Sequence, residues 1–394
     1  MTVNQSQYLS KTVTSLKPSG IRRFFDLAAN MEGVISLGVG EPDFVTSWAV
    51  REACILSLEE GHTSYTANAG LIELRREIAS YLNKQFAVEY SPENQLVVTV
   101  GASQALDLAM RAIINPGDEI IIVEPTFVSY GPLISLAGGV PVPIHTSGSD
   151  EFKLRPEQLE AVITHRTKAI LICSPNNPTG SVLSREELIA ISKVVEKYNL
   201  LVISDEIYAE LSYDKSYASF ASIPNMYDRT ILVSGFSKGF AMTGWRLGYV
   251  AAPKEIAQAM LKIHQYTMMC APTMAQYAAI EALRSGEHDV DEMRKSYRHR
   301  RNFFVNSLNE AGLTCHLPGG AFYAFPSIKS SGLSSEEFAE KLLLEEKVAV
   351  VPGSVFGESG EGYVRCSYAS SLESLQEATK RIGQFMNRRM AKVK

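Results

Sequence analysis

Continuous apolar runs alternate with amphipathic segments between about residues 95 and 250. The runs are rich in β-branched residues and apolar on both faces, which is typical of strands in a mostly parallel sheet that helices cover on both sides. The helical pattern at Ser184–Tyr198 opens with Ser-Arg-Glu-Glu, an N-cap followed by an acidic first turn. We therefore predict an α/β domain with a second helix at Ser103–Ile114 and strands at Leu96–Val100, Glu119–Val123, Lys168–Cys173, Leu200–Ser204 and Thr230–Ser234.

The pattern changes after about residue 290, where a smaller α+β domain is expected. A charged helix is predicted at Asp291–Ala311, and apolar positions on one face of Ser371–Met386 predict a closing helix. The segment up to Asp43 is too short to form a core alone, so we expect it to pack on the smaller domain. We predict an N-terminal arm at 1–45, a large domain at 46–288 and a small domain at 289–394.

Composition excludes several classes of protein. The 394 residues carry a net charge of −5 with no basic block, so a nucleic-acid partner is not expected. No apolar run approaches the roughly 20 residues that a membrane span requires. The five cysteines are widely separated and form no CxxC pair, which favours reduced thiols over a disulfide framework or a metal site. The polar first twenty residues lack the apolar core of a signal peptide, so we predict a cytoplasmic protein.

Lys238 is the first candidate for chemistry. It follows a predicted buried strand, lies among small and apolar residues, and precedes Arg246 by eight positions. A desolvated lysine has a lowered pKa and becomes a nucleophile that can form a Schiff base. Lys238 could also be a surface-loop lysine, but the neighbouring glycines and serine and the nearby arginine favour the functional interpretation.

Polar residues also follow two other predicted strands. Asp205 and Tyr208 lie at the carboxyl end of one strand, the edge at which ligands bind in open α/β sheets. A carboxylate there suits a cationic ring nitrogen and a phenol suits a ring oxygen, although Asp205 could instead cap a helix. Asn177, in Ser174–Gly180, could direct its amide into the same crevice, or the segment could be only a tight turn.

Val100–Ala105 is a strand-to-helix junction, where free N–H groups at a helix start can bind a phosphate. The same junction nearly matches the nucleophile elbow of hydrolases, with Ser103, Asp205 and His264 in hydrolase order. That alternative is weak, because Ala105 replaces the second glycine of the elbow and no oxyanion motif precedes it. No GxGxxG or GxxxxGK[ST] motif occurs, so neither nucleotide-binding fingerprint is present.

In combination, the motifs GASQA, SPNNPTG, SDEIY, GFSKGFAMTGWRLG and YVRCSYA resemble those of the pyridoxal-phosphate-dependent class I/II aminotransferases of fold type I. The match extends from Leu37 to Arg365 and is most similar to bacterial and archaeal aspartate/alanine-type enzymes, including those acting on acyl-diaminopimelate. The resemblance implies a large domain with a mostly parallel seven-stranded sheet covered by helices, and a smaller α+β domain.

The resemblance also implies the reaction. An L-amino acid of the aspartate or alanine type would pass its amino group to a 2-oxo acid, expected to be 2-oxoglutarate, by a ping-pong mechanism. An acyl-diaminopimelate or aromatic amino acid aminotransferase and a pyridoxal-phosphate-dependent C–S lyase remain alternatives, because Lys238 and Asp205 would serve each of them.

Cofactor contacts follow by resemblance. Lys238 would form the Schiff base and move the substrate proton, and Asp205 would keep the pyridinium nitrogen protonated. Tyr208 and Asn177 would hydrogen-bond the phenolic oxygen. Phe127 replaces the tryptophan that often stacks on the ring in aspartate aminotransferases, so the preferred substrate stays open. The residues expected to bind the phosphate are Ala102, Ser103, Ser237 and Arg246.

The remaining implied residues concern the substrate and a second subunit. Arg365 would clamp the substrate α-carboxylate as a bidentate fork, with Gly40 and Asn177 beside it. Tyr65 corresponds to a tyrosine that reaches the phosphate of the neighbouring subunit, which implies a homodimer. Arg22 or Arg23 could meet a second carboxylate, or both could be solvated.

Overall fold

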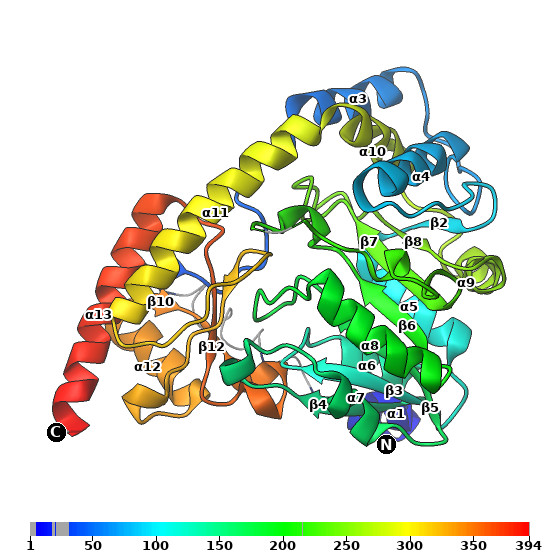
Figure 1. The fold of residues 1–394 in the computed structure, drawn as a ribbon. Coiled ribbons are helices and arrows are strands. Elements are labelled where there is room, and N and C mark those ends of the chain that lie inside the picture. Colours follow the sequence, from blue (N-terminus) through cyan, green and yellow to red (C-terminus); the bar gives the residue numbers. More distant parts are fainter. Residues whose placement is uncertain (1–4, 18–19, 21–30, 215, 394) are drawn as a thin grey trace.

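A seven-stranded sheet forms the centre of the structure, a computed structural model that describes residues 5–17, 20, 31–214 and 216–393 (Figure 1). Its strands are β2 (Leu96–Thr99), β3 (Glu119–Glu124), β4 (Val140–His145), β5 (Thr167–Cys173), β6 (Leu201–Asp205), β7 (Thr230–Gly235) and β8 (Gly248–Ala251). They lie in the order β2-β8-β7-β6-β5-β3-β4, and only β8 runs antiparallel to its neighbours. The predicted fold class, α/β with a mostly parallel seven-stranded sheet, is confirmed.

Helices cover both faces of this sheet because its strands are apolar on both sides. Ile120 and Ile122 face one helical layer, whereas Ile121 between them faces the other. The first layer contains α5 (Gly101–Ile113), α6 (Tyr130–Leu136) and α9 (Lys254–Thr267), and the second contains α7 (Pro156–Val162) and α8 (Arg185–Lys197). Near β2 and β8 lie α3 (Trp48–Glu59), α4 (Ile72–Phe86) and α10 (Thr273–Ser285) (Figure 1).

Helix α8 begins where its sequence predicts. The Oγ of Ser184 accepts a hydrogen bond from the Glu187 N–H at 3.3 Å, and the Glu187 carboxylate accepts one from the Ser184 N–H at 2.7 Å. This reciprocal pair satisfies two donors that a helix start leaves free.

The C-terminal elements pack around a separate apolar core. Strands β11 (Val351–Pro352), β12 (Val364–Ser367) and β9 (Tyr323–Ala324) form an antiparallel sheet. A parallel pair, β1 (Ile35–Ser36) with β10 (Val348–Ala349), brings the N-terminal segment onto this part. The helices here are α11 (Glu287–Glu310), α12 (Ser335–Glu346) and α13 (Leu372–Val393). Helix α11 extends from α10 to α13 (Figure 1). The domain limits given above stay predictions.

Two strands of the large sheet were not among the predicted ranges, and one helix begins earlier than predicted. Strand β4 contains Pro141 and Pro143 and lies at the sheet edge, where the missing N–H groups are tolerated. Strand β8 has only four residues, and α11 begins at Glu287, ahead of the predicted start. Within the described part of the chain, no helix has the length and apolar character to cross a membrane.

Candidate active site

A cavity of about 570 Å³ lies at the carboxyl ends of β5, β6 and β7, where the sheet faces the C-terminal elements. Tyr65 lies outside it and is 78% exposed. Arg22 and Arg23 lie outside the described residues. The other predicted site residues all line this cavity: Gly40, Ala102, Ser103, Phe127, Asn177, Asp205, Tyr208, Ser237, Lys238, Arg246 and Arg365.

Lys238 extends into the cavity from the segment after β7. Its Nζ donates a hydrogen bond to the carbonyl oxygen of Gly40 at 2.6 Å, which crosses from the large sheet to the N-terminal segment. Burial lowers the pKa of Lys238 to about 8, and the charge of Glu41 opposes this shift only in part. About one tenth of this amine is therefore neutral and nucleophilic at pH 7, far more than for an ordinary lysine.

Asp205 ends β6 and is 4% exposed. Its Oδ2 accepts a hydrogen bond from the Tyr130 hydroxyl at 2.6 Å, and its Oδ1 accepts one from the Ile207 N–H at 3.3 Å. Burial raises the pKa of Asp205, whereas these two donors and the Lys238 charge lower it. A buried carboxylate without an ion-pair partner is suited to hold a cationic nitrogen in the cavity.

Tyr208 joins the sheet edge to the C-terminal part. Its hydroxyl lies 2.9 Å from the hydroxyl of Tyr323 on β9, and the two rings meet edge to face at 5.8 Å. Both tyrosines are almost fully buried, and burial raises the pKa of each. The pair therefore stays neutral and presents a hydroxyl hydrogen bond to the cavity.

Two glycines bring Arg246 and β8 against the start of α5. A Cβ on Gly101, whose φ is +74°, would lie 2.6 Å from Nη2 of Arg246, and one on Gly248 would lie 2.5 Å from the Ala102 nitrogen. Arg246 itself has a φ of +52°, a conformation that costs a non-glycine residue about 1–2 kcal/mol. Its guanidinium thus joins the free N–H groups of the first turn, with Ser103 and Ser237 on the same cavity wall. This end of the cavity is suited to an anion.

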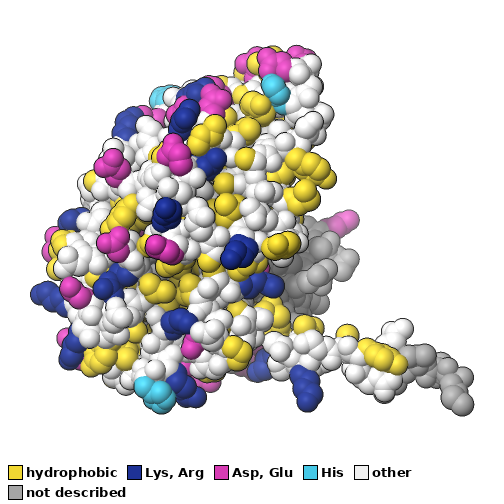
Figure 2. All heavy atoms as spheres, turned by 90° about the vertical axis from the view of Figure 1, so that its right-hand side faces the viewer, with side chains coloured by type: hydrophobic (Ala, Val, Ile, Leu, Met, Phe, Trp, Pro, Cys, Tyr) yellow, Lys and Arg dark blue, Asp and Glu magenta, His cyan; other side chains and the backbone are white. Residues whose placement is uncertain are grey.

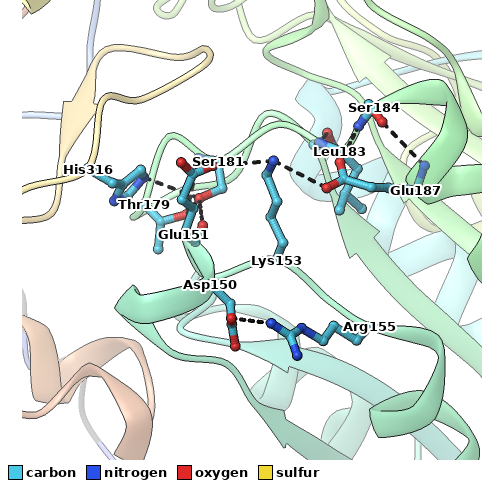
Figure 3. Close-up of polar contacts among 11 residues, drawn as sticks. Asp150, Glu151, Lys153, Arg155, Thr179, Ser181, Leu183, Ser184, Glu187 and His316 are labelled. Carbon is cyan, nitrogen blue, oxygen red and sulfur yellow. Dashed lines mark hydrogen bonds and ion pairs between the residues drawn. The ribbon is translucent and has the colours of Figure 1, made fainter.

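Polar contacts of Thr179 and Ser181 hold the loop that carries Asn177 in place (Figure 3). The Ser181 hydroxyl donates to the Glu151 carbonyl oxygen, lies 3.3 Å from Nε2 of His316 and accepts from the Thr179 hydroxyl at 3.0 Å. Burial lowers the pKa of His316, so the ring favours its neutral form. The loop conformation is therefore set by residues from both the large sheet and the C-terminal part.

Arg365 is 4% exposed and is oriented by contacts on every side. Its Nη1 donates to the Asn177 Oδ1 at 2.9 Å and its Nη2 donates to the Gly38 carbonyl oxygen at 2.6 Å. The guanidinium carbon lies 4.5 Å from the ring centroid of Tyr323 and 5.1 Å from that of Phe356. Its Nε is buried without a hydrogen-bond partner among the described residues. No carboxylate pairs with it in that part of the chain, so it can receive one from a ligand.

Sequence reasoning did not assign a role to Tyr130 or Tyr323, although both line the cavity. Tyr130 lies three residues after Phe127, and their rings meet edge to face at 5.6 Å. Tyr323 belongs to the aromatic run Phe322–Phe325. Hydroxylated aromatic residues beside predicted site segments are the signal that could have identified them. Glu41 also lines the cavity, where its Oε2 accepts a hydrogen bond from Thr243 at 3.3 Å.

The hydrolase arrangement does not form. His264 is buried on α9, with its Nδ1 2.9 Å from Nε2 of Gln104. Across the described ranges, no hydrogen bond connects Ser103 with Asp205 or His264. The cavity instead combines a nucleophilic amine, a buried carboxylate, an anion-binding end and a guanidinium.

Comparisons with known proteins agree with this set of groups. The family model for aminotransferase class I and II matches residues 32–382. The Bacillus subtilis protein named "Putative aminotransferase YugH" is 66% identical and is aligned over 97% of this chain and 99% of its own. An aspartate aminotransferase of Pyrococcus abyssi is 48% identical, over 96% of this chain and 98% of that protein. The solved structure of an aromatic aminotransferase from Pyrococcus horikoshii OT3 superposes with a TM-score of 0.89 at 46% identity, over 94% and 99% of the two chains.

The lowered pKa of Lys238 predicts its reactivity toward an amine-directed acylating reagent in the cofactor-free protein. We expect the acylation rate to rise about tenfold per pH unit below pH 8 and to level off above it, since only the neutral amine reacts. Lys295, whose pKa is raised by its hydrogen bond to Glu292, is the internal control and should keep gaining reactivity at higher pH. Peptide mass spectrometry after brief labelling measures both; coincident profiles would contradict the prediction.

Proposed function

The chain belongs to the class I and II aminotransferase family, and from this premise we propose that it transfers the amino group of an aspartate- or alanine-type L-amino acid to 2-oxoglutarate by a ping-pong mechanism. The observation that carries the proposal is the placement of the Lys238 amine in a cavity that also contains the Asp205 carboxylate and the Arg365 guanidinium. These three groups match a nucleophile, a partner for a cationic ring and a receptor for a carboxylate.

Members of this family use pyridoxal phosphate, and the residues of the cavity fit that group. The start of α5 and Arg246 suit its phosphate, and Gly101 leaves room for the arginine to approach. Phe127 offers a ring face for stacking, and the buried Asp205 suits a protonated ring nitrogen. The lowered pKa of Lys238 suits covalent attachment to an aldehyde. When bound, this cofactor supplies an electron sink for the bonds at the substrate Cα.

The chain's own residues then have distinct tasks in the proposal. Arg365 binds the substrate α-carboxylate, and its contacts with Asn177 and Gly38 fix the plane of the guanidinium. With the cofactor bound, Lys238 Nζ would take the proton from the substrate Cα and return one at C4′, because its lowered pKa would let it both accept and donate a proton near neutral pH. Tyr208 donates a hydrogen bond to the cofactor phenolic oxygen, and Asp205 keeps the ring nitrogen protonated.

The identity of the amino donor stays part of the proposal. Relatives of nearly equal identity carry names with different substrates, one an aspartate and another an aromatic aminotransferase. Phe127, in place of a tryptophan, is compatible with either. An aromatic or acyl-diaminopimelate donor and a C–S lyase reaction are therefore outcomes that the first experiment must separate.

The cysteines support a cytoplasmic location within the same proposal. All five are free in the structure, and burial raises the pKa of Cys173, Cys315 and Cys366. Thiols in this state suit a reducing compartment. Recovery of the enzyme in a secreted fraction would contradict this inference.

The proposal predicts a donor-dependent change in the absorption spectrum of the cofactor-loaded protein. Aspartate or alanine should replace the visible band with the near-ultraviolet band of the aminated cofactor, and 2-oxoglutarate should restore it. Aromatic amino acids and N-acetyl-diaminopimelate are tested in parallel. Loss of the band only with one of those would replace the proposed donor. Release of pyruvate, ammonia and a thiol from a cysteine S-conjugate, tested in the same assay, would indicate a lyase.

Two variants make that experiment specific. Arg365→Ala should lower kcat/KM. The expected loss of transition-state binding is about 2–5 kcal/mol, the range for removing one partner of a buried charged pair. Arg111→Ala, on an exposed arginine paired with Asp107, is the matched control. Lys238→Ala should bind the cofactor without turnover. Normal turnover in that variant would overturn the assignment.

A homodimer is the second part of the proposal. Exposed apolar side chains gather around α3, Tyr65 and the end of α9, including Trp48 (58% exposed), Leu56 (49%) and Tyr266 (88%). Figure 2, a view from the side on which α4, α9 and α10 lie, shows hydrophobic side chains along its upper right edge. The Thr273 hydroxyl donates to the Ser64 carbonyl oxygen at 2.8 Å, which joins these segments. Exposed apolar side chains gathered in one region, which we call the patch, favour an interface at this face.

The patch predicts that a charge on it weakens self-association. Leu56→Glu should shift the protein from dimer to monomer in sedimentation or light scattering, since a charge would be buried without a partner. Leu344→Glu on α12, which is 57% exposed and away from the patch, should leave the dimer intact. Equal masses for both variants would argue against this face as the interface.

The Tyr208–Tyr323 contact predicts that the hydroxyl of Tyr323 affects the pH midpoint of the cofactor band, whereas its ring affects the donor KM. Tyr323→Phe removes the hydroxyl 2.9 Å from Tyr208 and keeps the ring against Arg365. With Tyr208 donating to the cofactor phenolic oxygen, its hydroxyl oxygen accepts from Tyr323, and losing that hydrogen bond makes Tyr208 a weaker donor. The pH midpoint of the visible cofactor band should therefore rise with little change in donor KM. Tyr323→Leu also removes the ring and should raise the donor KM by about tenfold. An unshifted midpoint in the phenylalanine variant would contradict this prediction.

A further inference from the structure

A second cavity, of about 300 Å³, lies away from Lys238, between α4, the segment that follows Tyr208 and the first turns of α11. We call it the aromatic pocket, after four of its lining residues: Tyr81, Phe86, Tyr217 and Phe240. Phe240 belongs to the motif GFSKGFAMTGWRLG, but none of the lining residues has a role in the proposed function.

The four rings contact one another edge to face in a continuous series. The centroids of Tyr81 and Phe240 are 6.0 Å apart, those of Tyr81 and Phe86 are 5.9 Å apart, and those of Phe86 and Tyr217 are 5.4 Å apart. All four side chains are partly exposed, so ring surface is open to the pocket. The faces of aromatic rings carry negative charge density and attract a cation.

Glu210 adds a carboxylate to these rings. It is 7% exposed, its Oε1 accepts a hydrogen bond from the Tyr81 hydroxyl at 3.0 Å, and its Oε2 is buried with no hydrogen-bond partner in the described part of the chain. A Cβ on Gly239 would lie 2.8 Å from its Cγ, so this side chain packs tightly beside the residue that follows Lys238. Burial raises the pKa of Glu210 to about 7, as expected of a carboxylate that lacks a cation.

The other carboxylates of the pocket already have partners. Glu77 pairs with Arg284, Glu287 with Lys84 and Asp291 with Arg294, each at 2.7 Å. Among the described lining residues, Glu210 is thus the one carboxylate without an ion pair. Within the described part of the chain, this carboxylate therefore lies beside aromatic rings without an ion-pair partner.

We propose that the aromatic pocket binds a small organic cation of the alkylammonium class, with its charge against the rings and attracted from nearby by the Glu210 carboxylate. Aromatic side chains around an alkylated nitrogen recognise such ions by cation–π attraction, and a nearby carboxylate adds Coulomb attraction in a partly desolvated site. This site is separate from the amine-lined cavity, so it does not depend on the proposed transamination.

Calorimetric titration of the cofactor-loaded full chain with tetramethylammonium chloride tests the proposal, with sodium chloride at equal ionic strength as the salt control. Saturable binding is expected for tetramethylammonium and not for tert-butanol, its uncharged counterpart of similar shape. No saturable binding, or equal binding of both molecules, would overturn the proposal.

Variants identify the site. Glu210→Gln should raise the Kd for tetramethylammonium at least tenfold, whereas Glu77→Gln, on a carboxylate already paired at the rim, should change it less than twofold. Because a substitution at a buried position can disturb folding, Tyr217→Leu provides an independent test and should also weaken binding at least fivefold. Thermal unfolding checks that each variant is folded, and unchanged affinity in folded Glu210→Gln and Tyr217→Leu would refute the assignment.

Discussion

The buried guanidinium of Arg365 joins three distant parts of the chain at one point. Its nitrogens donate to Asn177, which follows β5, and to the carbonyl of Gly38 in the N-terminal segment, while Arg365 itself belongs to β12. A charge in this position is stabilised only if its donors are satisfied, and the buried Nε still lacks a partner among the described residues. The contacts that join these three segments therefore also orient the Arg365 guanidinium so that it can bind a carboxylate.

The opposite wall of the cavity depends on the parallel strands. Because β5, β6 and β7 run in one direction, the residues after them reach one edge of the sheet: Asn177, Asp205 and Lys238. Apolar helices on both faces exclude water from the strand ends, which shifts the pKa of the lysine downward and that of the aspartate upward. Sheet direction and burial together convert ordinary side chains into reactive ones.

Much of the fold and of the cavity could be predicted from the sequence, because five strands of the large sheet are apolar runs and Asn177, Asp205 and Lys238 lie at or just after the ends of three of them. Strand β4 escaped prediction since its prolines and edge position remove that pattern. Tyr130 and Tyr323 could not be assigned from local pattern, because their importance lies in hydroxyl contacts with Asp205 and Tyr208, 75 and 115 residues away. Glu210 could not be identified from the sequence either, because its lack of an ion-pair partner among the described residues is a property of the tertiary structure. Arg365 was identified by resemblance alone.

Helix α11 has a mechanical consequence. Its 24 residues form an unbroken rod of about 36 Å that starts beside the aromatic pocket and ends against α13. A rod of this length acts as a lever, so a tilt of about 5° at its first turn would move its last turn by about 3 Å. Arg301, in the second half of the helix, is anchored to Asp214 and to the carbonyl of Pro318. Beyond it, Phe304, Val305 and Leu308 pack in the apolar core of the C-terminal part, so the helix connects the packing around the aromatic pocket with that core.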